Sequence, residues 1–467
     1  KLMFAAGIVF AGICMFLLAR RLWGDSGGYL SAVLYLYFPY HALEIYVRGA
    51  VGEYWAYAFL PLVFLGLIIA IKKFRQGVLV GGLGLAVVIL SHNILGMLTA
   101  GILISWGIWE TARGIFTDIG KTKALIIMSV LFLGISLSAF FWLPALVEMK
   151  FTRAYTLVEG TNNFRDHFVY PDQLWDSPWG FAGSGPGRED GISFKIGKLH
   201  LILAVFGIVA LYFLNNSQKD KNSAKLRIGF VLVGGIIVSI LMMLSLSRTV
   251  WELVPVFAYV QYPWRFLVLV GFCISLLSGA AVLSVKRNGW QMGGAVFISL
   301  LAIFVNVKYF QPQTVSDKTV SSFTNPEKIR WDISNISDEY LPLDFPVPQK
   351  FDEVAQNKFT LLGDIIVESS EVKNHFIKLN VSARDKAEID FSVANFPGWQ
   401  IVLDTQKVRP RIMGRYLVVP LTEGKHIVSL YFTDTWIRVV GNAISLFGVL
   451  VSLAIAQKII CSRNEKN

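Results

Sequence analysis

Apolar residues fill long runs along most of the chain, and short polar segments separate these runs. A helix needs about 20 predominantly apolar residues to cross the roughly 30 Å hydrocarbon core of a bilayer. About eleven runs approach this length, although the second and fourth are short enough to be tilted or partly re-entrant. We predict membrane spans at residues 2–19, 28–40, 54–71, 77–91, 94–110, 124–147, 198–214, 228–247, 264–285, 289–308 and 437–457.

Residues 309–436 follow a different pattern. After two proline clusters, at 341–342 and 345–348, apolar and polar positions alternate in short segments, which is typical of strands with one buried face. Turn-forming residues such as Gly398 and Gly424 separate the segments. The simplest role for this region is a structural cap, and the alternative is a module that covers a membrane cavity or holds a glycan. We predict a small antiparallel β-sandwich with strands at 364–369, 375–381, 387–393, 399–403, 415–419 and 426–432.

Composition narrows the class of protein further. Of the 467 residues, 54% are hydrophobic and only 16% are charged, whereas soluble domains carry about 25% charged residues. This composition argues against a cytosolic enzyme, and it excludes a disordered chain. Cys14, Cys273 and Cys461 form no CxxC pair, so neither a disulfide framework nor a structural zinc site is expected.

The basic residues orient the spans. They cluster in six alternate connections, which the positive-inside rule assigns to the cytoplasm. Residues 309–436 lie on the opposite side and carry 17 acidic and 14 basic side chains. The net charge of +11 therefore belongs to the inner face, where anionic lipid explains it without nucleic acid. The clusters are Arg20/Arg21, Lys72/Lys73/Arg75, Arg113/Lys121/Lys123, Lys219/Lys221/Lys225/Arg227, Lys286/Arg287 and Lys458/Arg463/Lys466.

These patterns predict a polytopic α-helical protein of the plasma membrane with an extracytoplasmic β-sandwich-like domain inserted before the last span. Its parts are a multispan domain at 1–308 with an outer loop at 148–197, the β-rich domain at 309–436, and a final span with a basic cytoplasmic tail at 437–467. In this orientation the first span runs from outside to inside. We therefore expect an odd number of upstream crossings, with at least one outer loop before Lys1.

Ionisable residues at membrane depth are costly and mark functional candidates. Glu44 and Arg48 are four residues apart, so on a helix they would share a face and pair. Glu53 follows, beyond Gly49 and Gly52, which permit close backbone approach. The group is either a salt bridge that anchors a helix end, or an arginine that holds a lipid phosphate beside a carboxylate for proton transfer.

Two further candidates lie in outer connections. His92, in the turn at 91–93, is either a capping or packing residue, or a base or phosphate ligand at a cavity mouth. Arg265, after Tyr262 and Trp264, begins a span on the outer side against the positive-inside trend. It either extends to lipid headgroups or binds an anionic partner.

The loop at 148–197 is long enough to suggest a function. Asp166, His167 and Asp176 lie near aromatic residues, and this combination suits sugar binding because rings stack on sugars while carboxylates bind hydroxyls. The glycine run at 183–187 lacks the lysine–serine pair of a phosphate-binding loop, so nucleotide binding is not expected there.

Several strings together, in order, resemble bacterial membrane proteins that carry the domain called "6-pyruvoyl-tetrahydropterin synthase-related". Their layout is similar to that of the C-type (GT-C) membrane glycosyltransferases and of multispan proteins that decorate teichoic acids. The resemblance extends over nearly the whole chain and is more specific for the family than for an activity. The strings lie at 46–53, 60–62, 91–93, 141–148, 261–266, 338–342, 396–399 and 424–426.

The resemblance implies transfer of a sugar from a polyprenyl-phosphate carrier to an acceptor of the cell envelope on the outer face. Such enzymes usually carry the catalytic acid in the first outer loop, which here would precede Lys1. Among the residues present, Glu53, His92 and Glu148 are then the catalytic candidates. The candidates for substrate binding are Arg48, Arg265, Tyr262, Trp264, Asp166, His167 and Asp176.

Two alternatives stay open: a non-catalytic scaffold of envelope assembly, and a transporter of lipid-linked substrates. Pterin synthesis is not expected, because pterin synthases use a three-histidine zinc site and the six histidines here have no metal spacing. The sequence indicates no cofactor, and no motif supports a divalent metal.

Overall fold

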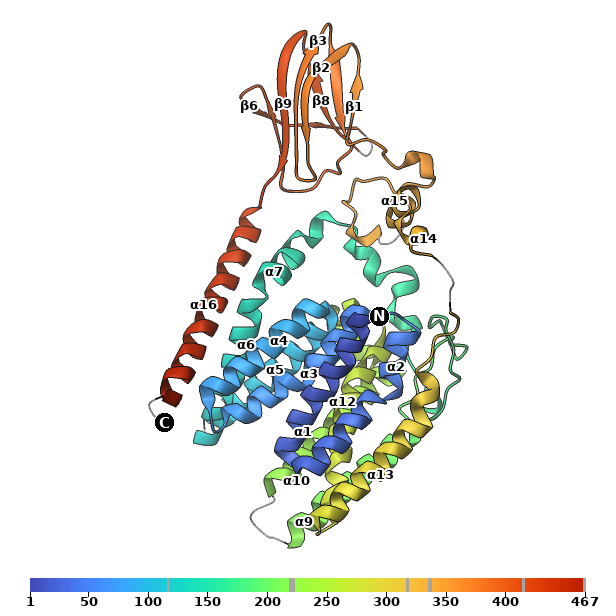
Figure 1. Ribbon diagram of the computed structural model, residues 1–467, viewed down its shortest axis with the longest axis vertical. Coiled ribbons are helices and arrows are strands. Elements are labelled where there is room, and N and C mark those ends of the chain that lie inside the picture. Colours follow the sequence, from blue (N-terminus) through green and yellow to red (C-terminus); the bar gives the residue numbers. More distant parts are fainter. Residues whose placement is uncertain (116, 218–222, 316–318, 335–337, 414–415, 465–467) are drawn as a thin grey trace. The chain divides into compact units, whose positions relative to one another are not determined.

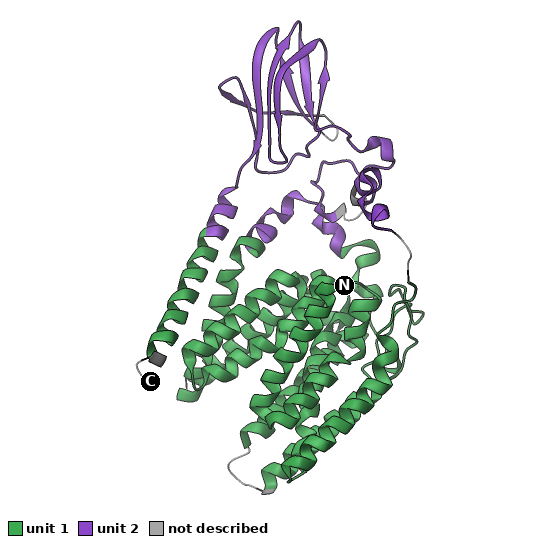
Figure 2. Cartoon of the chain, in the orientation of Figure 1, with its two compact units in different colours: residues 1–142, 158–315, 443–467 green, residues 143–157, 316–442 purple. Residues whose placement is uncertain are grey.

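The computed structural model describes residues 1–115, 117–217, 223–315, 319–334, 338–413 and 416–464. The chain divides into two compact units, coloured separately in Figure 2. The first contains residues 1–142, 158–315 and 443–467, and the second contains 143–157 and 316–442. Lys219, Lys221, Lys466 and Arg415 lie outside the described residues.

Ten of the described helical segments are long and apolar enough to cross a membrane, so the chain is a multi-pass helical membrane protein. They are α1 (Leu2–Leu36), α3 (Val51–Ala70), α4 (Phe74–Ser91), α5 (Asn93–Gly114), α6 (Asp118–Leu137), α9 (Lys198–Ser217), α10 (Ser223–Met243), a segment at Pro263–Ser284 built from η7 (Pro263–Phe266), α12 (Leu267–Ser278) and η8 (Gly279–Ser284), α13 (Asn288–Asn306) extended by η9 (Val307–Tyr309), and α16 (Trp436–Asn464) (Figure 1).

The first predicted span and most of the second, residues 28–36, fall within α1, which explains why ten segments are found among the described residues where about eleven spans were predicted. Gly24, inside α1, has non-helical dihedral angles (φ 79°, ψ −176°). In a straight helix residues 20 and 28 would be about 12 Å apart, but a Cβ on Gly28 would lie 3.0 Å from the Cβ of Arg20. The chain therefore folds back at Gly24. The return arm, residues 25–36, would extend only about 18 Å and is too short to cross a bilayer by itself.

A second difference concerns the predicted span 124–147. The helix ends at Leu137, Ser138 leaves helical geometry, and a separate helix α7 (Ala139–Glu148) follows. The Ser138 hydroxyl donates to the Gly134 carbonyl at 2.8 Å and so caps the end of α6. Shorter helices between the spans are α2 (Pro39–Tyr46), α8 (Pro171–Trp175), α11 (Arg248–Leu253), α14 (Val320–Thr324) and α15 (Pro326–Ser334).

Small residues bring α3 and α4 together. A Cβ on Gly66 would lie 2.2 Å from the backbone nitrogen of Gly81, and one on Gly77 would lie 2.1 Å from that of Ala70. Glycine at these positions lets the two backbones touch. In lipid the hydrophobic effect does not drive helices together, so this close van der Waals contact stabilises their packing.

The antiparallel β domain predicted before the last span is confirmed (Figure 1). Its two sheets have the strand orders β1-β4-β8-β7 and β2-β3-β9-β5-β6. Alternate residues of both sheets, including Leu379, Phe391 and Leu430, fill one shared core, so the sheets pack face to face. The strands are β1 (Phe359–Leu362), β2 (Ile365–Val372), β3 (Phe376–Ala383), β4 (Ala387–Phe391), β5 (Trp399–Leu403), β6 (Gln406–Val408), β7 (Arg411–Met413), β8 (Tyr416–Leu421) and β9 (Gly424–Phe432).

Candidate functional site

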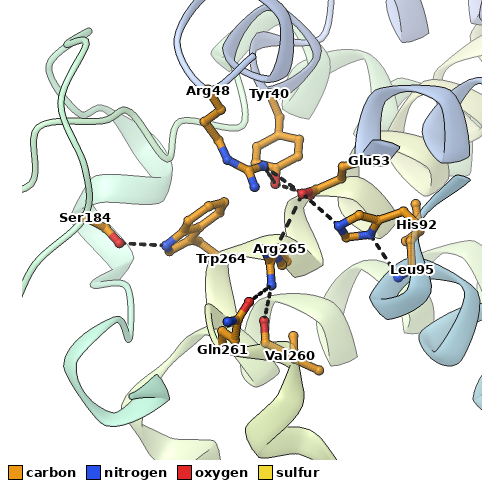
Figure 3. A network of polar contacts seen from close by, with 10 residues as sticks. All are labelled: Tyr40, Arg48, Glu53, His92, Leu95, Ser184, Val260, Gln261, Trp264 and Arg265. Atoms are coloured by element: carbon orange, nitrogen blue, oxygen red, sulfur yellow. Dashed lines mark hydrogen bonds and ion pairs between the residues drawn. The ribbon is translucent and has the colours of Figure 1, made fainter. Parts of the chain in front are cut away.

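Four charged or titratable side chains from separate parts of the first unit meet in one cluster (Figure 3). Arg48 lies in the connection between α2 and α3, and Glu53 in the first turn of α3. His92 is the single residue between α4 and α5, and Arg265 lies in η7. We call these four residues the arginine–glutamate cluster.

Glu53 is the centre of the cluster and is only 2% exposed. Its Oε1 accepts a hydrogen bond from the Tyr40 hydroxyl at 2.6 Å. Its Oε2 lies 2.8 Å from Arg48 Nη1, 3.7 Å from Arg265 Nε and 3.9 Å from His92 Nε2. One carboxylate thus faces two guanidinium groups and an imidazole, and the two arginines leave the group with an excess of positive charge.

Gly52 explains how the start of α3 reaches His92. A Cβ at this position would lie 2.5 Å from the carbonyl oxygen of Ser91. Only a residue without a side chain allows this backbone approach, and it places Glu53 beside the end of α4.

Arg48 does not pair with Glu44, so the prediction of a shared helical face is wrong. The helix α2 ends at Tyr46, and the chain then turns through Gly49 with φ +59°, which points Arg48 toward Glu53. The Arg48 guanidinium also donates to the Tyr40 hydroxyl at 3.0 Å and lies 4.6 Å above the Trp264 ring. Glu44 is fully buried, and burial together with the charge of Glu53 raises the pKa of its carboxyl.

Arg265 points into the protein and does not extend to the surface. It is 9% exposed, and its Nη1 donates to the Val260 carbonyl at 2.6 Å and to Gln261 Oε1 at 2.8 Å. Gln261 has φ +65°, an uncommon conformation for a residue other than glycine. The turn places the Val260 carbonyl and the Gln261 side chain against the Arg265 guanidinium. The alternative in which Arg265 reaches lipid headgroups is therefore wrong.

His92 caps α5, as one of the two sequence interpretations expected. Its Nδ1 accepts a hydrogen bond from the Leu95 amide at 3.2 Å, so Nε2 carries the proton and faces Glu53. Burial, opposed by the charge of Glu53 and reinforced by those of Arg265 and Arg48, lowers the pKa of His92 to about 4. The imidazole is therefore neutral near pH 7.

Tyr262 and Trp264 connect the cluster to the loop that follows α7. Their rings stack with centroids 5.0 Å apart. The Tyr262 hydroxyl donates to Asn162 Oδ1 at 2.7 Å, and Trp264 Nε1 donates to Ser184 Oγ at 3.0 Å. His167 joins the same group, since its Nδ1 lies 2.8 Å from Ser184 Oγ.

The other sequence candidates lie elsewhere. Asp176 is exposed and pairs with Lys195 and Lys198, whose ammonium groups bond to its oxygens at 3.0 and 2.9 Å and lower its pKa to about 2. Asp166 is also exposed. Within the described part of the chain, neither carboxylate has a hydrogen bond or ion pair with the arginine–glutamate cluster.

Glu148 belongs to the second compact unit. Its carboxylate accepts from Arg438 at 2.6 and 3.0 Å and from the Thr435 hydroxyl. Arg438 in turn lies 4.8 Å above the Phe432 ring. These contacts tie the end of α7 to the start of α16.

Sequence reasoning assigned no role to Tyr40, Gln261 or Ser184, although the last two lie in strings that it singled out, at 261–266 and 183–187. These residues carry no charge, and their types are common in loops and helix ends, so spacing along the chain contained no signal for them. Among the described residues, no group of three or more His, Cys, Asp or Glu side chains is arranged to hold a metal ion. No protein-family model, curated protein or solved structure matches this chain.

Proposed function

We propose that this protein is a membrane glycosyltransferase that moves a sugar from a polyprenyl-phosphate carrier to an acceptor of the cell envelope on the outer face. The observation that carries the proposal is the convergence of Arg48 and Arg265 on one buried carboxylate, Glu53, at the ends of membrane spans. The family resemblance of the sequence supports the same reaction.

The charge balance of the cluster favours an anionic ligand. Two guanidinium groups share Glu53, so a phosphate that enters would complete the neutralisation of both arginines. Arginine binds phosphate through two parallel hydrogen bonds. Where polyprenyl phosphate is the leaving group, two arginines at this point would stabilise the negative charge that develops as the bond to the sugar breaks.

The position of the cluster suits a lipid-linked donor. Arg48 and His92 come from two connections, and Arg265 from the first turn of a span. The basic residues assign all three positions to one side of the membrane, and the three side chains meet around Glu53. A phosphate at the end of a membrane-embedded polyprenyl chain would lie at this depth. In this proposal Glu53 orients the arginines, and His92 or Glu53 moves a proton.

A second candidate is a non-catalytic membrane scaffold. The specific observation in its favour is that the cluster is closed: Glu53 and Arg265 are almost completely buried and contact their protein partners directly. A closed ion-pair network also serves to cross-link spans, and a ligand would have to open it.

The test uses the full-length protein reconstituted with radiolabelled undecaprenyl-phosphate sugars. We expect transfer of label by the unchanged protein and at least a hundredfold slower transfer by Arg48→Ala, because loss of one charge-stabilising donor typically costs two to three orders of magnitude. Arg227→Ala, at an exposed arginine, is the matched control and should keep full activity.

Three outcomes separate the candidates. Loss of transfer in Arg48→Ala alone supports the proposed site. Transfer that survives Arg48→Ala keeps the enzyme and rejects the site. Absence of transfer with every donor favours the scaffold.

A further inference from the structure

Ser184 lies in the glycine run at 183–187, the segment in which no nucleotide-binding motif was found. Its hydroxyl has two polar neighbours, His167 Nδ1 at 2.8 Å and Trp264 Nε1 at 3.0 Å. The first comes from the same loop, and the second from the span that carries Arg265.

The histidine is held in one tautomer. His167 Nε2 lies 2.8 Å from the Thr161 carbonyl oxygen, and a carbonyl only accepts hydrogen bonds, so Nε2 carries a proton. In the neutral imidazole Nδ1 is then the acceptor. Ser184 must therefore donate its hydroxyl proton to His167.

The Trp264 indole also favours removal of the Ser184 proton. An indole N–H only donates, so Trp264 donates to Ser184 Oγ. The serine oxygen thus gives its proton to one neighbour and accepts a hydrogen bond from the other. The Trp264 N–H stabilises negative charge on Oγ, and His167 Nδ1 is placed to take the hydroxyl proton. This is the arrangement of an activated nucleophile: a base in hydrogen-bond reach, itself oriented by a third group, here the Thr161 carbonyl.

The chain on either side of Ser184 is not packed against another segment, and a cation lies close by. A Cβ on Gly183 or Gly185 would meet no described atom within 4 Å apart from its immediate chain neighbours. The Arg48 guanidinium lies 4.6 Å from the Trp264 ring, whose nitrogen reaches Ser184 (Figure 3). The Trp264 indole thus separates the positively charged Arg48 from Ser184, and a cation at this position suits an anionic phosphoryl group on the serine.

We infer that Ser184 is a nucleophile for a phosphodiester, with His167 as its base. Oγ attacks phosphorus and forms the Oγ–P bond, while the bond from phosphorus to the leaving alcohol breaks. The Ser184 proton passes to His167 Nδ1 and then to the departing alkoxide. A hydroxyl acceptor reverses these steps, taking the phosphoryl group and returning the proton to Ser184 Oγ. This activity stands apart from the proposed sugar transfer and does not depend on it.

The test treats the folded full-length protein, in detergent, with a fluorophosphonate probe, in which fluoride is the leaving group. We expect one modified serine, identified as Ser184 by peptide mass spectrometry, and no modification in Ser184→Ala. His167→Gln removes the base and should label at least a hundredfold more slowly, in line with the usual contribution of a general base. Trp264→Phe removes one hydrogen bond to the charged oxygen and should label about tenfold more slowly.

Ser322→Ala is the matched control, because this half-buried hydroxyl donates to the Thr319 carbonyl at 2.8 Å and, among the described residues, has no histidine partner; its labelling should equal that of the unchanged protein. Failure of the unchanged, folded protein to label at Ser184 would overturn the inference. Labelling at an equal rate in His167→Gln would also overturn it. Neither result bears on the transfer of sugars, since the probe contains none.

Discussion

At the scale of single residues, Glu53 decides whether two arginines can remain buried near the end of a span. A buried charge without a partner is strongly destabilising, and a paired one is tolerated. Glu53 faces Arg48, Arg265 and the neutral His92 through Oε2, and its Oε1 accepts a hydrogen bond from Tyr40. Two glycines produce this geometry. Gly49 turns the chain with its positive φ, and Gly52 lets the start of α3 approach the backbone of Ser91.

Replacing Glu53 with Gln should destabilise the protein by about 3–5 kcal/mol, because the buried Arg265 and the half-buried Arg48 would lose their counter-charge. Thermal unfolding in detergent would measure the effect. The control is Glu252→Gln, whose carboxylate also contacts two arginines, Arg165 and Arg248, but at the exposed surface. A Glu53→Gln protein as stable as this control would show that the cluster does not hold the spans together.

Protonation of His92 should reduce stability in acid. Burial lowers its pKa to about 4 from an ordinary 6.5, so between these values the unfolded chain binds a proton that the folded chain does not. The contribution of His92 is therefore complete above about pH 6.5 and is lost as the pH falls toward 4. His92→Asn keeps a good capping residue but cannot be protonated. Its melting temperature should fall less between pH 7.5 and 5 than that of the unchanged protein, and an equal fall would contradict the assignment.

At the scale of elements, the reversal at Gly24 sets the arrangement of the first two helical segments. It places Arg20 beside the turn, where it pairs with Asp25. A positive φ with an extended ψ is essentially confined to glycine, so this one residue explains why an apparently continuous helix returns along itself.

Gly24→Ala should cost about 1–3 kcal/mol of stability. The cost comes from backbone strain alone, since a Cβ there would meet no atom of the described chain within 4 Å. Gly101→Ala provides the matched control: it has equal space, but lies within the regular helix α5, where alanine is favoured over glycine. Thermal unfolding should separate the two variants. If Gly24→Ala and Gly101→Ala were equally stable, the positive φ at Gly24 would not be required for the turn.

At the scale of the whole molecule, the described residues separate into ten span-length segments and one β domain because their apolar residues follow two different patterns. Strands β3 and β4 alternate buried and more exposed residues, whereas the spans are apolar throughout. Which side of the membrane carries the β domain is a prediction from the basic residues.

Thiol labelling in intact cells would test that side. Ser370→Cys lies on β2 and Thr122→Cys near the start of α6, both at exposed positions. An impermeant maleimide should modify Ser370→Cys without permeabilisation, and Thr122→Cys only after it. The opposite result would invert the orientation and place the arginine–glutamate cluster on the cytoplasmic side.

Local patterning explains how far prediction from the sequence reached. Spans and strands depend on runs of neighbouring residues, so most were predicted with boundaries wrong by a few positions. The exceptions are informative: β1, β6 and β7 are only three or four residues long, and the break at Ser138 depends on one residue. Arg48, Glu53, His92 and Arg265 were each predicted as candidates because a charge at a span end is conspicuous.

Contacts between distant segments required the tertiary structure. The sequence by itself determined a multispan helical protein with a β domain before its last span, because burial periodicity is a local property. Only the fold decided that Arg48 turns from Glu44 to Glu53, that Arg265 points inward, and that Ser184 meets both His167 and Trp264. Those choices depend on a helix end, on two positive backbone torsions and on close backbone approaches, none of which leaves a periodic trace along the chain.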